Sequence, residues 1–263
     1  MTTMTKTWMW LAPQRGALAL LNPADAGVWS DRLRFDRERV SRHQSPELAA
    51  ITEAIRERAQ SAGAAAVVLS GSTARGRRTA VSDLDYHVIG IPSLQVADLP
   101  EDIDLYADEL NRFWAKLRDG DDFAHWSVWY GCVLFDSGVM HEAARYVAER
   151  DLWPDPERKL RQARGALDFA EKMVASGDYE AALEQVRGAL SLMARWLLLS
   201  HDVFPLARDE LPGQLDQLGH VDLARPLRRS IRERPSSEEL REAVAHAREI
   251  SEGTRLPSGR AAA

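Results

Sequence analysis

Two short apolar segments, residues 64–69 and 84–89, constrain the fold of this chain more than any other feature of its sequence. The first ends in two valines and a leucine, and it predicts a buried strand. In the second, apolar residues alternate with polar ones, which predicts a strand with one polar face. Glycines and small polar residues follow the first segment, so we expect two strands connected through a turn and a short helix.

The apolar pattern changes character near residue 141. Before that point, helices are predicted over residues 46–62 and 107–118, a further short strand in the segment IDLYA, and a helix followed by a strand in the segment WSVWYGCVLFD. After it, apolar residues at helical spacing predict two long helices over residues 156–175 and 179–200. The first part is therefore typical of a mixed α/β domain, and the second part of a helical one.

Signals at the ends of the predicted helices support this division. Gly177 and Asp178 supply a helix stop and an N-cap, which predicts an antiparallel helical hairpin. Ser236 and Glu239 form a capping box that begins a last helix. We therefore expect an α+β chain with an α/β domain and N-terminal extension at residues 1–140, a helical domain at residues 141–252 and a flexible tail at residues 253–263.

Composition excludes several functional classes. With a formal net charge of −6 and no strongly basic half, the chain lacks the surface that duplex nucleic acid requires. A single cysteine, Cys132, excludes a disulfide framework and a thiolate zinc site. No apolar run approaches the ~18 residues of a membrane span, and the N-terminus is unlike a signal peptide. We expect a cytoplasmic protein that binds neither duplex nucleic acid nor a membrane.

Two carboxylates mark the start of the second strand. In a strand, residues i and i+2 face the same side, so Asp83 and Asp85 lie roughly 6–7 Å apart on one face. Two oxygen ligands at this spacing suit Mg²⁺, which completes its shell with water and phosphate oxygens. Gly71 and Ser72, at the end of the first strand, supply backbone N–H groups and a hydroxyl that suit a phosphate. The stretch predicts a site for Mg²⁺ and a phosphorylated ligand.

This combination resembles the DNA polymerase β-like nucleotidyltransferase superfamily. The matching residues are Gly71, Ser72, Asp83 and Asp85, and Asp104 fits the third carboxylate that the family places on a neighbouring strand. The specific resemblance covers residues 48–136, and a looser one continues to about residue 215. It is nearest to the aminoglycoside and minimal nucleotidyltransferases that carry a C-terminal helical domain. It implies a small mixed sheet flanked by helices, followed by an all-α helical bundle domain.

The resemblance also implies a reaction and roles for named residues. It implies Mg²⁺-dependent transfer of a nucleoside monophosphate from an NTP to an acceptor hydroxyl, with release of pyrophosphate. Asp83, Asp85 and Asp104 are then the catalytic and metal-binding residues, and they hold two Mg²⁺ ions. Gly71, Ser72 and Arg75 bind the nucleotide, with Arg77 and Arg78 as further candidates for its phosphates. ATP is the expected donor, although nothing in the sequence selects the base.

The acceptor follows less directly from the residues. An acidic chain with an acidic segment beside the site favours a cationic or neutral small molecule, as in the aminoglycoside and lincosamide enzymes. One alternative is a protein acceptor, as for minimal nucleotidyltransferases in toxin–antitoxin systems. Another is an interaction protein that binds a nucleotide without transferring it. The sequence selects neither the acceptor nor the oligomeric state.

Overall fold

The computed structural model describes residues 45–75, 83–96, 99–100 and 102–253, and it divides the chain into two compact units after Pro154. We call these the sheet unit, which ends at Pro154, and the helical unit, which begins at Asp155. The N-terminal extension, Arg77, Arg78 and the predicted tail beyond Gly253 lie outside the described residues. Within the described ranges, no helix is both long and apolar enough to cross a membrane.

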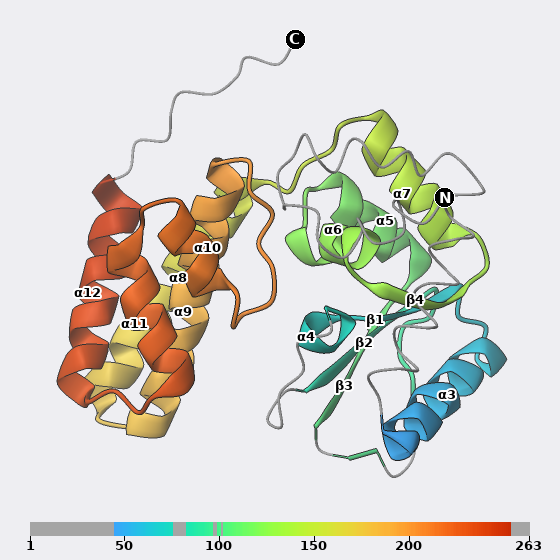
Figure 1. Ribbon diagram of the computed structural model, residues 1–263, viewed down its shortest axis with the longest axis horizontal. Helices are drawn as coiled ribbons and strands as arrows, with labels where there is room; N and C mark the ends of the chain where they lie inside the picture. The colour runs from blue at the N-terminus through green and yellow to red at the C-terminus, as the bar shows by residue number, and fades with distance from the viewer. Residues whose placement is uncertain (1–44, 76–82, 97–98, 101, 254–263) are drawn as a thin grey trace. The chain divides into compact units, whose positions relative to one another are not determined.

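The sheet unit is built on a four-stranded mixed sheet with the strand order β3-β2-β1-β4 (Figure 1). Strand β1 pairs antiparallel with both β2 and β4, whereas β2 and β3 run parallel. The strands are short and apolar on at least one face, as the sequence predicts. Their bounds are Ala66–Leu69 (β1), Leu84–Ile89 (β2), Ile103–Asp108 (β3) and Cys132–Asp136 (β4).

Helices cover both faces of this sheet. On one face, the Thr52 hydroxyl of α3 (Pro46–Ser61) lies 2.7 Å from the Tyr86 hydroxyl of β2. Since neighbouring residues of a strand point to opposite faces, His87 projects to the other face. There its ring contacts residues of the next helices in the chain, which Figure 1 shows together above the sheet. These helices are α5 (Leu110–Arg118) and α6 (Asp122–Trp129).

Two further helices complete the sheet unit. Helix α4 (Gly71–Ala74) is the short helix expected after the first strand. Helix α7 (Val139–Glu149) belongs to the sheet unit, so this unit extends beyond the boundary expected at residue 141. The helix expected over residues 107–118 begins only at Leu110, because β3 extends through Asp108 and delays it.

The helical unit begins with the predicted hairpin of α8 (Pro156–Ser176) and α9 (Tyr179–Ser200). Gly177 ends α8 in the left-handed conformation, with a φ of 79°, and the Asp178 carboxylate accepts from the backbone N–H of Ala181. Three more helices pack against this pair around a core of leucine, alanine and other apolar side chains. They are α10 (Leu211–Gln217), α11 (Val221–Arg232) and α12 (Ser237–Gly253).

The last helix begins with the predicted capping box. The Glu239 N–H donates to the Ser236 hydroxyl at 3.2 Å, and the Ser236 N–H donates to the Glu239 carboxylate at 2.8 Å. By contrast, the sequence analysis did not predict α11, which contains Pro226 in its interior. Proline lacks the N–H that would bond to the carbonyl four residues earlier, so it usually ends a helix. The α+β class and the all-α second part are confirmed.

Candidate active site

The candidate site is built around a turn that has no room for a side chain. After β1, the Ser70 N–H donates to the Asp85 carbonyl at 2.7 Å, and the chain then turns at Gly71 with a φ of 66°. A Cβ atom at Gly71 would lie only 2.1 Å from Oδ2 of Asp85. Glycine is needed here for its left-handed conformation and for this close approach. The sequence-predicted Gly71 and Asp85 are therefore direct neighbours.

The sheet register brings a second predicted carboxylate beside the first. Asp104 of β3 is the register partner of Asp85 in the parallel pair, so both residues project from the same face. Asp104 is exposed, and Asp85 is half-buried. Asp83 is exposed and lies one residue before β2 begins. The topology thus unites Asp85 with Asp104, while Asp83 stands at the entrance of the strand.

These carboxylates fit Mg²⁺ as one part of a ligand set. Across the described ranges, no three His, Cys, Asp or Glu side chains are close enough to hold an ion by themselves. Mg²⁺ usually takes only one or two carboxylates and fills its octahedral shell with water and substrate phosphates. The Asp85–Asp104 pair beside a turn without a side chain matches that requirement.

The turn also presents hydroxyl groups. Ser70 and Thr73 are buried, and neither hydroxyl has a hydrogen-bond partner among the residues that the structure describes. Buried polar atoms are nearly always paired, so two orphaned hydroxyls around Gly71 are unusual. Ser72 is half-buried in α4, and Arg75 ends this helix with its guanidinium 5.2 Å from the ring centroid of Tyr130.

A buried polar network extends along the same face of the sheet. His87 follows Asp85 by two residues, and its Nε2 lies 3.2 Å from the Asp108 carboxylate of β3. The Lys116 ammonium of α5 donates to both Asp108 oxygens at 2.9 Å. The Ser127 hydroxyl of α6 lies 3.0 Å from Nδ1 of His87. The network joins β2, β3 and two helices below the candidate site.

The chain is similar in fold to the crystal structure of a nucleotidyltransferase-like protein from Exiguobacterium sibiricum 255-15. The two chains are 16% identical, the alignment covers 77% of this chain and 75% of the other, and the TM-score is 0.39. No family model matches this chain. No curated protein matches it either. The chemistry of the site is therefore inferred from its own geometry.

The protonation of the buried network follows from its surroundings. Burial lowers the pKa of His87 below its ordinary value, despite the hydrogen bond to Asp108. Burial raises the pKa of Asp108, but the hydrogen bonds from His87 and Lys116 outweigh this and leave it below its usual value. A neutral His87 that donates from Nε2 to the ionised Asp108 carboxylate is consistent with the lowered pKa of each residue. The network is thus a fixed support for the strands that carry Asp85 and Asp104.

Sequence reasoning missed this network. His87 occupies a polar position of the predicted strand, which is the one signal that points to it. Its partners come from β3, α5 and α6, and they meet only because β2 and β3 pair in parallel. A search by residue spacing cannot detect such a contact, since the contact depends on the topology of the sheet.

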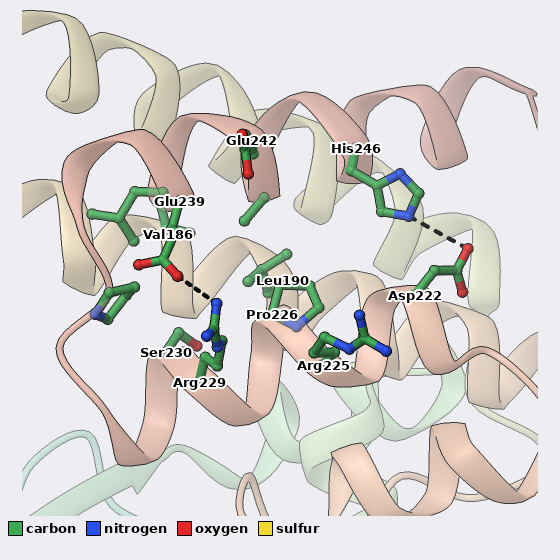
Figure 2. A pocket seen from close by; sticks show the side chains of 13 residues that line it. Val186, Leu190, Asp222, Arg225, Pro226, Arg229, Ser230, Glu239, Glu242 and His246 are labelled. Carbon is green, nitrogen blue, oxygen red and sulfur yellow. Dashed lines mark hydrogen bonds and ion pairs between the residues drawn. The ribbon is translucent and has the colours of Figure 1, made fainter.

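A groove of about 290 Å³ lies within the helical unit, among α9, α11 and α12. Figure 2 shows two contacts across it: Arg229 with Glu239, and the His246 ring with the Asp222 carboxylate at 3.4 Å. Each pair joins α11 to α12, and apolar residues of α9 such as Leu190 form the floor. The groove contains none of the residues predicted to bind the nucleotide or metal. We interpret these two contacts as links that hold α11 against α12.

Proposed function

We propose that this chain transfers a nucleoside monophosphate from an NTP to a hydroxyl of a small-molecule acceptor and releases pyrophosphate. The observation that carries the proposal is the contact between Gly71 and the Asp85 carboxylate, with Asp104 in register beside it. The two carboxylates can hold Mg²⁺, which takes its remaining ligands from water and from the phosphate oxygens of a substrate. The resemblance to the aminoglycoside and minimal nucleotidyltransferases favours the same reaction.

Each predicted residue has a part in this reaction. Asp85 and Asp104, with Asp83 at the entrance, would hold Mg²⁺, which neutralises phosphate charge and acidifies the attacking hydroxyl when it is bound. The Ser72 hydroxyl and Arg75 orient the phosphates of the NTP. The acceptor oxygen attacks the α-phosphorus, the bond from that phosphorus to the bridging oxygen breaks, and pyrophosphate leaves. Asp104 accepts the proton of the acceptor hydroxyl.

The negative charge around the site bears on which class of acceptor it attracts. Asp83 and Asp104 are exposed, and the whole chain carries a net charge of −6. Such a site attracts cationic compounds and repels polyanions such as a nucleic acid strand. We therefore propose a cationic or neutral small molecule that carries a hydroxyl group, with ATP as the first donor to examine.

Mass spectrometry tests the proposal directly. The full chain is incubated with Mg²⁺, each NTP in turn and a panel of cationic and neutral aminoglycoside-like and lincosamide-like alcohols. The expected product is an acceptor that is heavier by one nucleoside monophosphate. An adduct on a protein instead would favour the protein-acceptor alternative, and NTP binding without any adduct would favour an interaction protein.

Two glycine variants provide matched controls. Gly71→Ala places a methyl group against the Asp85 carboxylate and is expected to abolish transfer. Gly63 also has a positive φ, of 84°, but a Cβ there has no neighbour within 4 Å. Gly63→Ala therefore costs a similar conformational strain of about 1 kcal/mol and keeps transfer intact. Full activity in Gly71→Ala would contradict the proposed position of the nucleotide.

A further inference from the structure

Two histidines in the helical unit point their side chains at one another. His201 follows the last residue of α9, and His220 precedes the first residue of α11. Their Nε2 atoms are 3.3 Å apart, and the ring centroids are 5.3 Å apart at an interplanar angle of 53°. His201 is exposed and His220 is partly exposed, so solvent reaches the pair.

The separation of the two nitrogens suits a shared metal ion. Zn²⁺–N bonds measure about 2.0–2.1 Å, so two nitrogens at a tetrahedral angle around one zinc lie about 3.3–3.4 Å apart. Without an ion, the same distance allows a hydrogen bond between the two rings, which a bound ion would replace. We propose that His201 and His220 form a binding site for Zn²⁺ or a similar divalent transition-metal ion, with water as the remaining ligands.

The backbone holds both histidines in place before any ion arrives. The His201 N–H donates to the Leu198 carbonyl at 3.0 Å, and the chain turns sharply at Asp202. The His220 N–H donates to the Leu215 carbonyl at 3.0 Å, directly after the positive-φ turn at Gly219. Neither residue has to refold to bring its imidazole into position, which lowers the entropic cost of binding.

A glutamine fastens the two segments together. The Gln214 amide of α10 donates to the Phe204 carbonyl at 2.9 Å, and its oxygen accepts from the Leu206 N–H at 2.9 Å. Gln214 is buried, so both hydrogen bonds are shielded from water. The loop that begins at His201 is thereby fixed to the helix that leads to His220. These hydrogen bonds help to fix the distance between the His201 and His220 rings.

The two imidazoles are the protein ligands of the proposed site. A neutral imidazole presents a lone pair, as a metal ligand must. In the part of the chain that the structure describes, no third His, Cys, Asp or Glu completes the set. We therefore expect an open site with exchangeable water ligands.

The test has two parts, both on the untagged full chain. Titration with Zn²⁺ alone is measured by calorimetry, and titration with Co²⁺ is measured by visible absorption. The wild type is expected to bind one ion, to give the visible absorption of four-coordinate Co²⁺, and to melt at a higher temperature with Zn²⁺. His201→Gln and His220→Gln are each expected to lose the Co²⁺ absorption and the thermal shift.

His246→Gln is the matched control, because His246 lies in the same unit and contacts Asp222 at 3.4 Å. This variant is expected to bind Zn²⁺ as the wild type does. Melting curves in a chelator verify that all three variants fold. A wild type that shows no saturable binding overturns the proposal. Binding that survives both His201→Gln and His220→Gln, or that is lost in His246→Gln alone, also overturns it.

Discussion

The two units of this protein place their ionisable groups in different ways. Among the described residues of the sheet unit, His87, Asp108, Asp122 and His125 are all buried. In the described part of the helical unit, Lys159 is the buried ionisable residue, and the core is a large apolar cluster. Burying an ionisable group costs stability unless hydrogen bonds compensate. The sheet unit bears this cost at four residues, whereas the described part of the helical unit bears it at Lys159.

The largest effect is expected from the carboxylate that contacts Gly71. Asp85→Asn removes one negative charge from the site and is expected to reduce nucleotidyl transfer by at least about 10³-fold, because charge stabilisation dominates such reactions. Folding should be unchanged or slightly improved, since neighbouring carboxylates repel one another without a metal. Transfer is measured as the rate of pyrophosphate release, and folding as the melting temperature.

Glu57→Gln is the control for this variant. Glu57 lies on α3 with a side chain that is 66% exposed, so its replacement removes the same charge from a position outside the proposed site. Turnover is expected to stay at the wild-type level. If Asp85→Asn folds and still turns over at that level, the metal and nucleotide assignment is wrong, and the contrast between the two units loses its functional meaning.

In the helical unit, the largest effect is expected on stability. Leu167 of α8 is fully buried in the apolar cluster, and Leu167→Ala is expected to cost about 3–4 kcal/mol through the cavity it leaves. Phe169, two residues on, is 55% exposed, so Phe169→Ala should change stability by no more than about 0.5 kcal/mol. Urea denaturation followed by circular dichroism measures both. Equal losses would mean that the apolar core does not stabilise this unit.

The sequence predicted the elements of the fold better than their pairing. The hairpin of α8 and α9 was found because each helix carries a long apolar stripe and the connection carries Gly177 and Asp178. Helix α11 was missed because Pro226 lies in its interior, where proline normally ends a helix. The family resemblance implied a mixed sheet with Asp104 on a neighbouring strand, but the parallel pairing of β2 and β3 was not predicted, because residue periodicity does not determine strand order.

For the candidate site too, local motifs could be predicted from the sequence, whereas contacts between distant segments could not. Gly71 and Asp85 were predicted from local motifs, and the structure places them in contact. The roles of Gly71, Asp85 and Asp104 remain predictions, although the register sets Asp104 beside Asp85. The network of His87, Asp108 and Lys116 was not predicted, because its members lie far apart in the sequence and meet only through the sheet.

An intermediate effect is expected on the pH dependence of the sheet unit. Burial lowers the pKa of His125 from 6.5 to about 4. The unfolded chain therefore binds a proton near pH 6.5 that the folded chain accepts only near pH 4, so stability falls as the pH drops through this window. The full loss is about 3 kcal/mol, from 1.36 kcal/mol per pKa unit. His87, whose pKa is also lowered, acts in the same direction.

Urea denaturation at a series of pH values between 7 and 4 measures this slope. His125→Gln retains a donor for the Leu117 carbonyl, which the His125 Nε2 contacts at 3.0 Å, and removes the titrating group. The slope is expected to flatten in this variant even if its stability at pH 7 is lower. His141→Gln, on α7, should keep the wild-type slope. An unchanged slope in His125→Gln would show that the buried ring does not account for the acid sensitivity.

The smallest effect is expected on the stability of the helical unit, at the start of α12. There Ser236 and Glu239 cap the helix through two hydrogen bonds. Ser236→Ala removes the hydroxyl that accepts from the Glu239 N–H and is expected to cost about 1 kcal/mol. The next residue supplies the control, because Ser237 is exposed and begins the helix itself, so Ser237→Ala should be nearly neutral. Melting temperatures of the two variants give the comparison. Equal shifts would mean that the capping box adds nothing beyond helix propensity, and that the apolar core alone stabilises this unit.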